Sequence, residues 1–240
     1  YLETFYSLRR AGTALRRLGA IDFATTLAPG LRDVLLTGNA VEVVRRADKR
    51  AQDRYDAVVM DAPPTGRITR FLNVNAQMSG LAKVGPIRNH ADLVMGVIAS
   101  ARTVVHLVTV LEEMPVQETI DAVAELRGAG LRLGGVIVNL TRPPQLDPAG
   151  LDAARAGRLP RDGIVAELGR AGLAQQAEAL AATLVAEAAD HAERIALQER
   201  ESDRVASLGL PTVELPLLPD GVDLGGLYEL AEALTEGGFG

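Results

Sequence analysis

The stretch 55–67 (YDAVVMDAPPTGR) constrains the fold more than any other part of the chain. Its apolar first half predicts a buried strand over 56–60, and Asp61 follows at once. Two prolines then restrict the backbone, whereas Gly66 leaves the loop free in its φ angle. A carboxylate at the carboxyl end of a parallel strand is where nucleotide-binding sheets hold Mg²⁺ beside phosphates. The alternative interpretation is a buried strand followed by an ordinary turn.

Further apolar runs predict a βαβ unit in the middle of the chain. The run over 103–109 does not alternate, which is typical of a strand buried on both faces of a parallel sheet. A helix over 115–129 ends near glycines, and a strand over 135–139 follows. This order predicts a right-handed crossover between parallel strands. A last strand is expected over 211–215.

Helical periodicity accounts for most of the remaining residues. Helices are expected over 1–18, from Pro29 toward Gln52, and over 68–81, 89–100, 173–207 and 224–235. The stretch 141–163 is rich in Pro, Gly and Asp, which predicts a loop or a mobile excursion.

The string from Asp61 to Arg67 resembles switch II of the ArsA-type ATPases. These are deviant P-loop ATPases that include arsenite-pump ATPases and tail-anchored-protein targeting factors. Further stretches resemble family motifs in the same order, namely 29–33 (PGLRD), 112–119 (EEMPVQET) and 215–219 (LPLLP). The resemblance covers nearly all of the chain and is greatest to the short actinobacterial branch often labelled anion-transporter ATPase.

The resemblance implies an α/β fold with a mostly parallel sheet flanked by helices, like a P-loop NTPase that is incomplete at its N-terminus. It also implies a single domain over 1–240, with helical subdomain elements at about 68–100 and 141–207. The implied function is that of an Mg-ATPase that uses ATP and Mg²⁺ and works as a dimer. ATP binding would close two subunits, hydrolysis would reopen them, and the change would alter affinity for an unknown client protein.

The resemblance assigns the phosphate end of the site to switch II. Asp61 would hold Mg²⁺ through a water, since Mg²⁺ keeps much of its hydration shell. Thr65 and Gly66 would approach the γ-phosphate with a hydroxyl and a backbone N–H. Arg67 stands where most members have His, and it would pair with phosphate or with an acid across an interface. The alternative for Arg67 is a surface salt bridge.

The resemblance places the base at the carboxyl edge of two later strands. Asn139 would read the adenine edge, because an amide offers both a donor and an acceptor. Pro216 would pack against the base, and Arg142 would touch ribose or phosphate. Taken alone, the asparagine also fits a turn cap and the proline a strand terminator. Glu112 and Glu113 resemble an acid/base pair, but their position predicts favourable charges at a helix start.

No Gly-x-x-x-x-Gly-Lys-Ser/Thr sequence occurs in the 240 residues, although the resemblance calls for one ahead of switch II. Only 60 residues precede Asp61. We therefore expect an N-terminal truncation that removes the P-loop and leaves this chain with impaired nucleotide binding. The alternative is a non-catalytic subunit or scaffold that pairs, as a heterodimer, with a competent ATPase paralogue. A ParA/MinD-type partitioning ATPase fits the Pro-Pro-Thr-Gly sequence less well.

The composition of the chain restricts the classes of partner and of metal chemistry that are expected. The net charge of −6 argues against a nucleic-acid partner. The lack of cysteine excludes disulfides, suits a reducing cytoplasm and speaks against metalloid or zinc-thiolate chemistry. No apolar stretch is long enough to predict an integral membrane segment. His106 lies within a predicted buried strand, which favours a core role over metal ligation.

Overall fold

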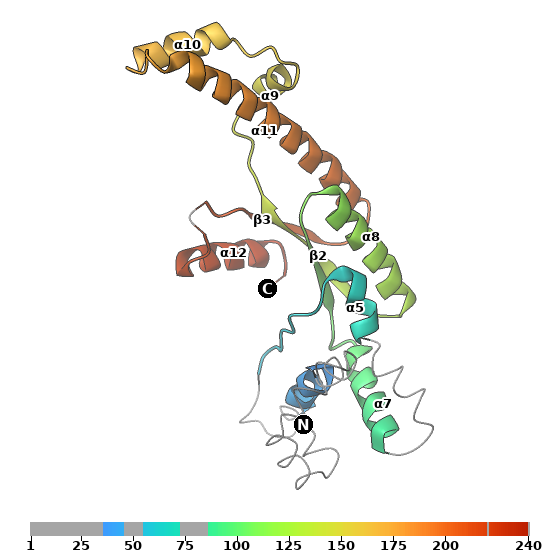
Figure 1. The fold of residues 1–240 in the computed structure, drawn as a ribbon. Coiled ribbons are helices and arrows are strands. Elements are labelled where there is room, and N and C mark those ends of the chain that lie inside the picture. The colour runs from blue at the N-terminus through green and yellow to red at the C-terminus, as the bar shows by residue number, and fades with distance from the viewer. Residues whose placement is uncertain (1–35, 46–54, 73–85, 220, 240) are drawn as a thin grey trace, which may run out of the picture. The chain divides into compact units, whose positions relative to one another are not determined.

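A computed structural model describes residues 36–45, 55–72, 86–219 and 221–239 (Figure 1). The helix expected over 1–18 and the outer parts of those expected from Pro29 toward Gln52 and over 68–81 lie outside these ranges. The chain divides into two compact units. The first comprises Tyr1–Val105 and Asp121–Gly134, and the second comprises His106–Ile120 and Gly135–Gly240. Each unit is described by itself below.

The described part of the chain contains a three-stranded sheet of β1 (Val105–Thr109), β2 (Leu133–Thr141) and β3 (Thr212–Pro216), in the order β1-β2-β3. Strands β2 and β3 are parallel, with Val136 beside Thr212 and Val138 beside Glu214. Helices flank this sheet, so the predicted α/β class is confirmed. All three predicted strands of this region are present.

Strand β1 is buried on one face, although its sequence predicts burial on both. Leu107 and Thr109 are buried, whereas His106 is exposed and Val108 is 57% exposed. The side chains of a strand alternate between the two faces of a sheet, and within the described residues only one face of β1 is covered. The apolar run therefore overstates the burial of this strand.

Helix α8 (Glu113–Gly128) connects β1 to β2 and helps to form the main core of the second unit. Val116 of α8 packs with Val136 and Val138 of β2 and with Val205 near the end of α11 (Ala177–Ala206). All four side chains are essentially inaccessible to solvent. The burial of these aliphatic groups fixes one end of α11 against the sheet.

Helices α9 (Pro148–Arg155) and α10 (Arg161–Arg170) occupy much of the stretch that was expected to be a loop. The expectation is wrong over Pro148–Arg155 and over 161–163, whereas 156–160 form no helix or strand. The start of α9 carries a local signal for a helix. The carboxylate of Asp147 caps α9 by accepting from the Gly150 N–H at 2.7 Å, and Pro148 suits the first helical position.

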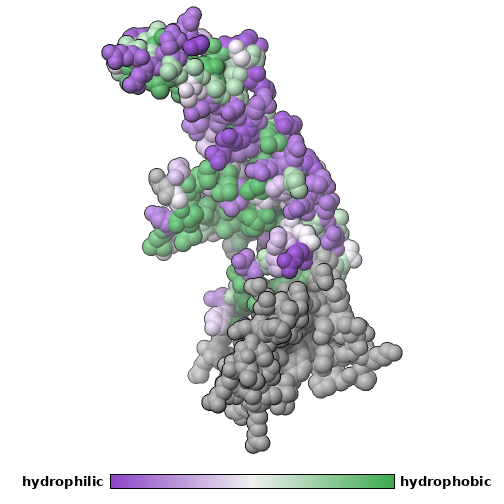
Figure 2. Space-filling model, in the orientation of Figure 1, coloured by the Kyte–Doolittle hydropathy of each residue, from purple (hydrophilic) through white to green (hydrophobic). Residues whose placement is uncertain are grey.

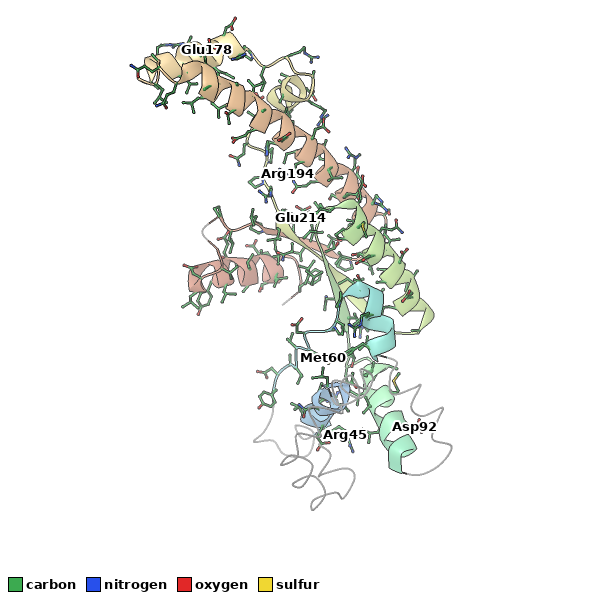
Figure 3. All side chains as sticks on the ribbon, viewed as in Figure 1. Arg45, Met60, Asp92, Glu178, Arg194 and Glu214 are labelled. Carbon is green, nitrogen blue, oxygen red and sulfur yellow. The ribbon has the colours of Figure 1, made fainter. Side chains whose placement is uncertain are left out.

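The long helix α11 has a second contact region, which extends from its first turn to just past its middle. Both α9 and α10 pack against α11. Leu151 and Ala154 of α9 bury themselves against Ala192 and Ile195. Arg161 of α10 also donates to the carboxylate of Glu178 at 3.0 Å. Glu178, which is labelled in Figure 3, lies in the first turn of α11.

The last helix, α12 (Leu224–Glu236), packs against β3. Its start is capped by the Asp223 carboxylate, which accepts from the Gly226 N–H at 2.8 Å. Large apolar side chains on and just before this helix are exposed, and the helix forms a largely apolar surface in Figure 2. They are Val222, Leu224, Leu227 and Tyr228.

The first unit contains a helix over 36–45, α5 (Thr65–Leu72) and α7 (Pro86–Ile98). Residues 55–64 form no strand, which corrects the prediction of a strand over 56–60. Val59 is 94% exposed, and the described residues provide no neighbouring strand for this segment. An isolated extended segment cannot satisfy its backbone groups as a sheet does, so its apolar sequence does not produce a strand.

Across the residues that the structure describes, none of the helices has both the length and the apolar character required to cross a membrane.

Candidate functional site

The first unit positions the residues predicted to contact phosphate and metal. Asp61 is exposed in the irregular segment ahead of α5. The helix begins at Thr65, and its first turn is closed by the Arg67 N–H, which donates to the Pro64 carbonyl at 2.9 Å. The first N–H groups of a helix have no acceptor within that helix and form a site of positive potential. A carboxylate thus precedes a helix start that favours anions.

Gly66 lies in this first turn with open space around it. A Cβ at Gly66 would meet no atom within 4 Å. The side-chain direction of Gly66 is therefore open among the described residues. Arg67 follows in the same turn and is exposed, and no ion pair to it exists among the described residues. The surface salt bridge that was the alternative for Arg67 is absent from that part of the chain.

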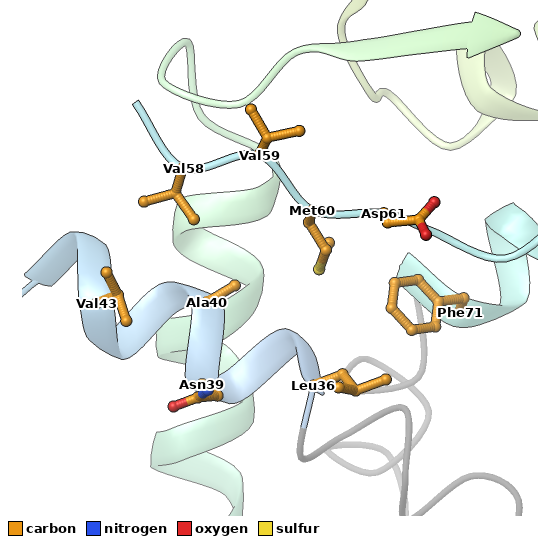
Figure 4. Close-up of a pocket in the computed structure, with 9 residues that line it drawn as sticks. All are labelled: Leu36, Asn39, Ala40, Val43, Val58, Val59, Met60, Asp61 and Phe71. Atoms are coloured by element: carbon orange, nitrogen blue, oxygen red, sulfur yellow. The ribbon is translucent and has the colours of Figure 1, made fainter. Parts of the chain in front are cut away.

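Asp61 also borders a pocket of about 230 Å³ within the first unit (Figure 4). Most of its lining is apolar and comes from the helix over 36–45, the segment before Asp61 and Phe71 of α5. In Figure 4 the Met60 side chain points toward Phe71, whereas the Asp61 carboxylate points away from the helix over 36–45. The carboxylate therefore belongs to the open side of the segment, where a hydrated ion has access.

The donor set around Asp61 suits a weakly chelated, hydrated cation. The described residues contain no cluster of three or more His, Cys, Asp or Glu side chains that could enclose a metal. Asp61 has no ion-pair or hydrogen-bond partner among them either. Mg²⁺ is commonly held by one or two carboxylates, with waters and phosphate oxygens completing its shell. A single exposed carboxylate fits that mode and does not fit an all-protein cage.

The second unit holds the residues predicted to bind the base, and here strand β2 is distorted. Its register with β3 shifts between Val138 and Thr141. Leu140 has a φ of 59°, the only positive value found for a non-glycine residue in the described part of the chain. The Asn139 Oδ1 accepts from the Leu140 N–H at 2.9 Å and so stabilises this bulge. Bulges and left-handed residues cluster at functional sites, where they redirect side chains.

Beyond the bulge, the last residues of β2 and β3 are paired again. Thr141 lies beside Pro216, its carbonyl accepts from the Leu217 N–H at 2.9 Å, and its hydroxyl donates to the Leu215 carbonyl at 3.2 Å. Thr141 and Pro216 thus pair at the carboxyl edge of β2 and β3, where ligands bind in open α/β sheets, and Asn139 lies two residues before the end of β2. The Asn139 amide nitrogen has no acceptor among the described residues and remains a donor.

Arg142 is exposed, and its backbone is held by α11. Its N–H donates to the Gln198 Oε1 at 3.1 Å, and the Gln198 Nε2 donates to its carbonyl at 3.1 Å. Further along the same loop, the Gln145 N–H donates to the His191 Nε2 at 3.0 Å. The sequence did not indicate these contacts. The seven-residue spacing of His191 and Gln198 predicts a shared helix face but does not identify the loop that they bind.

The remaining candidates have structural roles. Glu113 is the first residue of α8, and Glu112 precedes it, so their position at a helix start is as predicted. His106 does not lie in the core: its ring is exposed on β1, 5.1 Å from the ring of Phe239.

The predicted site residues therefore fall into two groups in the structure. Asp61, Thr65 and Gly66 lie together in the first unit. Asn139, Arg142 and Pro216 lie together in the second unit.

Comparison with known proteins gives three informative relatives. ATPase BagA of Mycobacterium tuberculosis and Mb3704 of Mycobacterium bovis, also named as an ATPase, are each 48% identical over 238 residues. These matches cover 99% of this chain and 70% of each relative. ATPase GET3 of Kluyveromyces lactis is 30% identical over 79 residues, which is 30% of this chain and 23% of the yeast protein. No family model matches the chain. Because the mycobacterial match extends over almost every residue, the chain belongs to the family of ATPases that includes BagA.

Proposed function

We propose that this protein is an ArsA-type Mg-ATPase whose phosphate site is formed by switch II. The observation that carries the proposal is the exposed Asp61 carboxylate, which is separated from the start of α5 by only three residues. The ATPase names of relatives at 48% identity support the same activity. The 79-residue match to GET3 favours the ArsA-type class among ATPases.

In this proposal a water attacks the γ-phosphorus, and the bond to the oxygen that bridges it to the β-phosphate breaks. The products are ADP and inorganic phosphate. The Thr65 hydroxyl and the Gly66 N–H bind γ-phosphate oxygens, and the positive end of α5 stabilises the charge on them. Asp61 holds Mg²⁺, which when bound neutralises charge on the β- and γ-phosphates. The free choice of φ at Gly66 would let the loop rearrange when phosphate departs.

The base and ribose occupy the carboxyl edge of β2 and β3 in the proposal. The Asn139 amide nitrogen donates to an adenine ring nitrogen, and the remaining lone pair on Oδ1 accepts from the exocyclic amine. Pro216 packs against the face of the base, and Arg142 reaches the ribose or a phosphate. Two subunits, alike or paralogous, close on ATP and reopen after hydrolysis, and this change alters affinity for a client protein.

The test compares binding and turnover in the full-length protein, because the 240 residues contain no P-loop sequence and their nucleotide binding is expected to be impaired. Calorimetry with Mg-ATP, Mg-GTP and ATP plus EDTA is combined with a phosphate-release assay on wild type and on Asn139→Ala. We expect Mg-ATP to bind more tightly than Mg-GTP, and the substitution to weaken Mg-ATP about tenfold, as the loss of one well-formed hydrogen bond would. Binding without phosphate release would instead identify a non-catalytic subunit. Neither binding nor release would overturn the proposal.

A further inference from the structure

The loop that follows β2 lies along one face of α11 and is held there at two points. Gln198 binds Arg142, and His191 binds Gln145. Seven residues, or two helical turns, separate the two α11 side chains, so they project from the same face. Figure 1 shows the connection from β2 to α9 running beside α11. The loop is thus held by side chains that belong to another element.

Gln198 satisfies both backbone hydrogen-bonding groups of Arg142. A carboxamide carries one acceptor and one donor side by side, and Gln198 uses both on the two backbone groups of one residue, each at 3.1 Å. This is the pairing that a neighbouring strand would provide. Alanine at this position would leave both groups of Arg142 without their protein partner, although helix propensity would be preserved.

The second contact has a strict chemical requirement. The Gln145 N–H is a donor, so the His191 Nε2 must present its lone pair, as in a neutral imidazole protonated at Nδ1. The neighbouring Leu146 packs with Ala188, Ala192 and Ile195 of α11 and adds an apolar anchor. The loop is therefore held by a hydrogen bond and an apolar contact just beyond the Gln198 pair.

The residue held by Gln198 directly follows the bulge of β2. Leu140 has a positive φ, and such a conformation persists only when neighbouring contacts maintain it. On one side, Thr141 is fixed to β3 through the Leu217 N–H and the Leu215 carbonyl. On the other side, Gln198 fixes the peptide groups of Arg142. The orientation of Asn139 at the start of the bulge depends on both.

We propose that Gln198 is a positioning residue that sets nucleotide affinity through Arg142 and the bulge at Asn139. His191 is a second positioning residue with a smaller effect. This inference rests on the proposed function, because it assumes that the base binds at the edge of β2 and β3. It adds a residue on α11 that acts on the nucleotide without touching it. The inference also couples nucleotide binding at the edge of β2 and β3 to α11, the helix against which α9 and α10 pack.

The experiment uses Gln198→Ala, His191→Ala and Asn139→Ala, with Glu199→Ala as the matched control. Glu199 is exposed on the next position of α11 and has no partner among the described residues. Calorimetry gives the dissociation constants for Mg-ATP and Mg-GTP. We expect Gln198→Ala to weaken Mg-ATP about tenfold and to reduce the preference over Mg-GTP, with a smaller loss for His191→Ala. The Glu199→Ala protein should match wild type.

Two readouts separate positioning from a general loss of structure. Amide hydrogen exchange should become faster at Arg142 in Gln198→Ala and at Gln145 in His191→Ala, while the urea midpoint stays within the range of the control. Gln198→Glu keeps an acceptor for the Arg142 N–H but loses the donor, so its affinity should fall between wild type and the alanine variant.

The outcomes also separate the inference from the proposed function. If Asn139→Ala weakens Mg-ATP but Gln198→Ala binds like the control, the positioning role is wrong and the base site stands. If Asn139→Ala has no effect and Mg-ATP is not preferred over Mg-GTP, both the base site and the inference are wrong.

Discussion

Glu201 and Arg204, one turn apart on α11, form an ion pair of 2.7 Å whose carboxylate is only 4% exposed. The same guanidinium donates to the Gln117 side chain of α8 at 2.5 Å. Arg204 therefore neutralises an almost buried charge and also fastens the C-terminal end of α11 to the start of α8. A charge of this kind is tolerated in a core only while its partner remains in place.

Arg204→Met should destabilise the protein by about 1–3 kcal/mol, because the stem is kept while a buried carboxylate loses its charged partner. Adding Glu201→Gln should recover part of the loss. Urea denaturation measures both effects. Arg170→Met is the control, since Arg170 pairs with Glu167 on the surface of α10, and such exposed pairs contribute at most about 1 kcal/mol. Equal losses for the two arginines would contradict the role assigned to Arg204.

Gly135→Ala should cost about 1–3 kcal/mol through overpacking. A Cβ there would overlap the Pro211 carbonyl oxygen and lie 2.5 Å from the Phe239 ring, so the backbone between β2 and β3 would have to shift. Gly169→Ala in α10 is the matched control, because it has open space and gains helix propensity. Thermal melting should show a lower midpoint for the first variant and an unchanged or higher midpoint for the second.

Leu140→Gly should leave stability unchanged or raise it by about 1 kcal/mol, because glycine adopts a positive φ without steric cost. The comparison is Val108→Gly, another exposed apolar strand residue, whose φ is not positive. That change should cost about 0.5–1 kcal/mol. A clear loss at Leu140, measured by the same urea titration, would mean that its side chain and not its backbone governs the bulge.

In the full-length protein, Asp61→Asn should reduce Mg-dependent phosphate release about a hundredfold or more, as expected when several kcal/mol of metal-assisted stabilisation are lost. The fold should be unaffected, since the side chain is exposed. Asp56→Asn is the control: this acid precedes the same segment and is also exposed. Circular dichroism verifies folding. Near-normal turnover in Asp61→Asn would refute the metal assignment.

Helix α8, strand β2 and helix α11 were predictable because their signals are local. The helix over 115–129 corresponds to α8, and the strand over 135–139 lies within β2. The long helix expected over 173–207 is one unbroken helix, α11, of 30 residues. The start of α9 was also readable, because Asp147-Pro148 is a helix signal, but the high Pro and Gly content of the stretch obscured it.

The errors arise where structure depends on partners that are distant in sequence. An apolar run such as 56–60 becomes a strand only if neighbours complete its hydrogen bonds, and the described residues supply none. The same dependence explains the exposed face of β1. Motif comparison predicted Asn139 and Pro216 as neighbours at the base site. It could not predict the Leu140 bulge or the Gln198 contact, which arise from tertiary packing.

The length of α11 has a mechanical consequence. A straight helix of 30 residues spans about 45 Å, at about 1.5 Å per residue. One end is anchored by Val205 and Arg204 beside α8. Helix α9 packs near the middle, and α10 is joined to the first turn at Glu178. A tilt of about 5° at the anchored end would sweep the far end through about 4 Å over such a length. In such a tilt the helix would act as a lever arm, because a displacement too small to open the sheet would still be large enough to disrupt the contact of α10 at the far end.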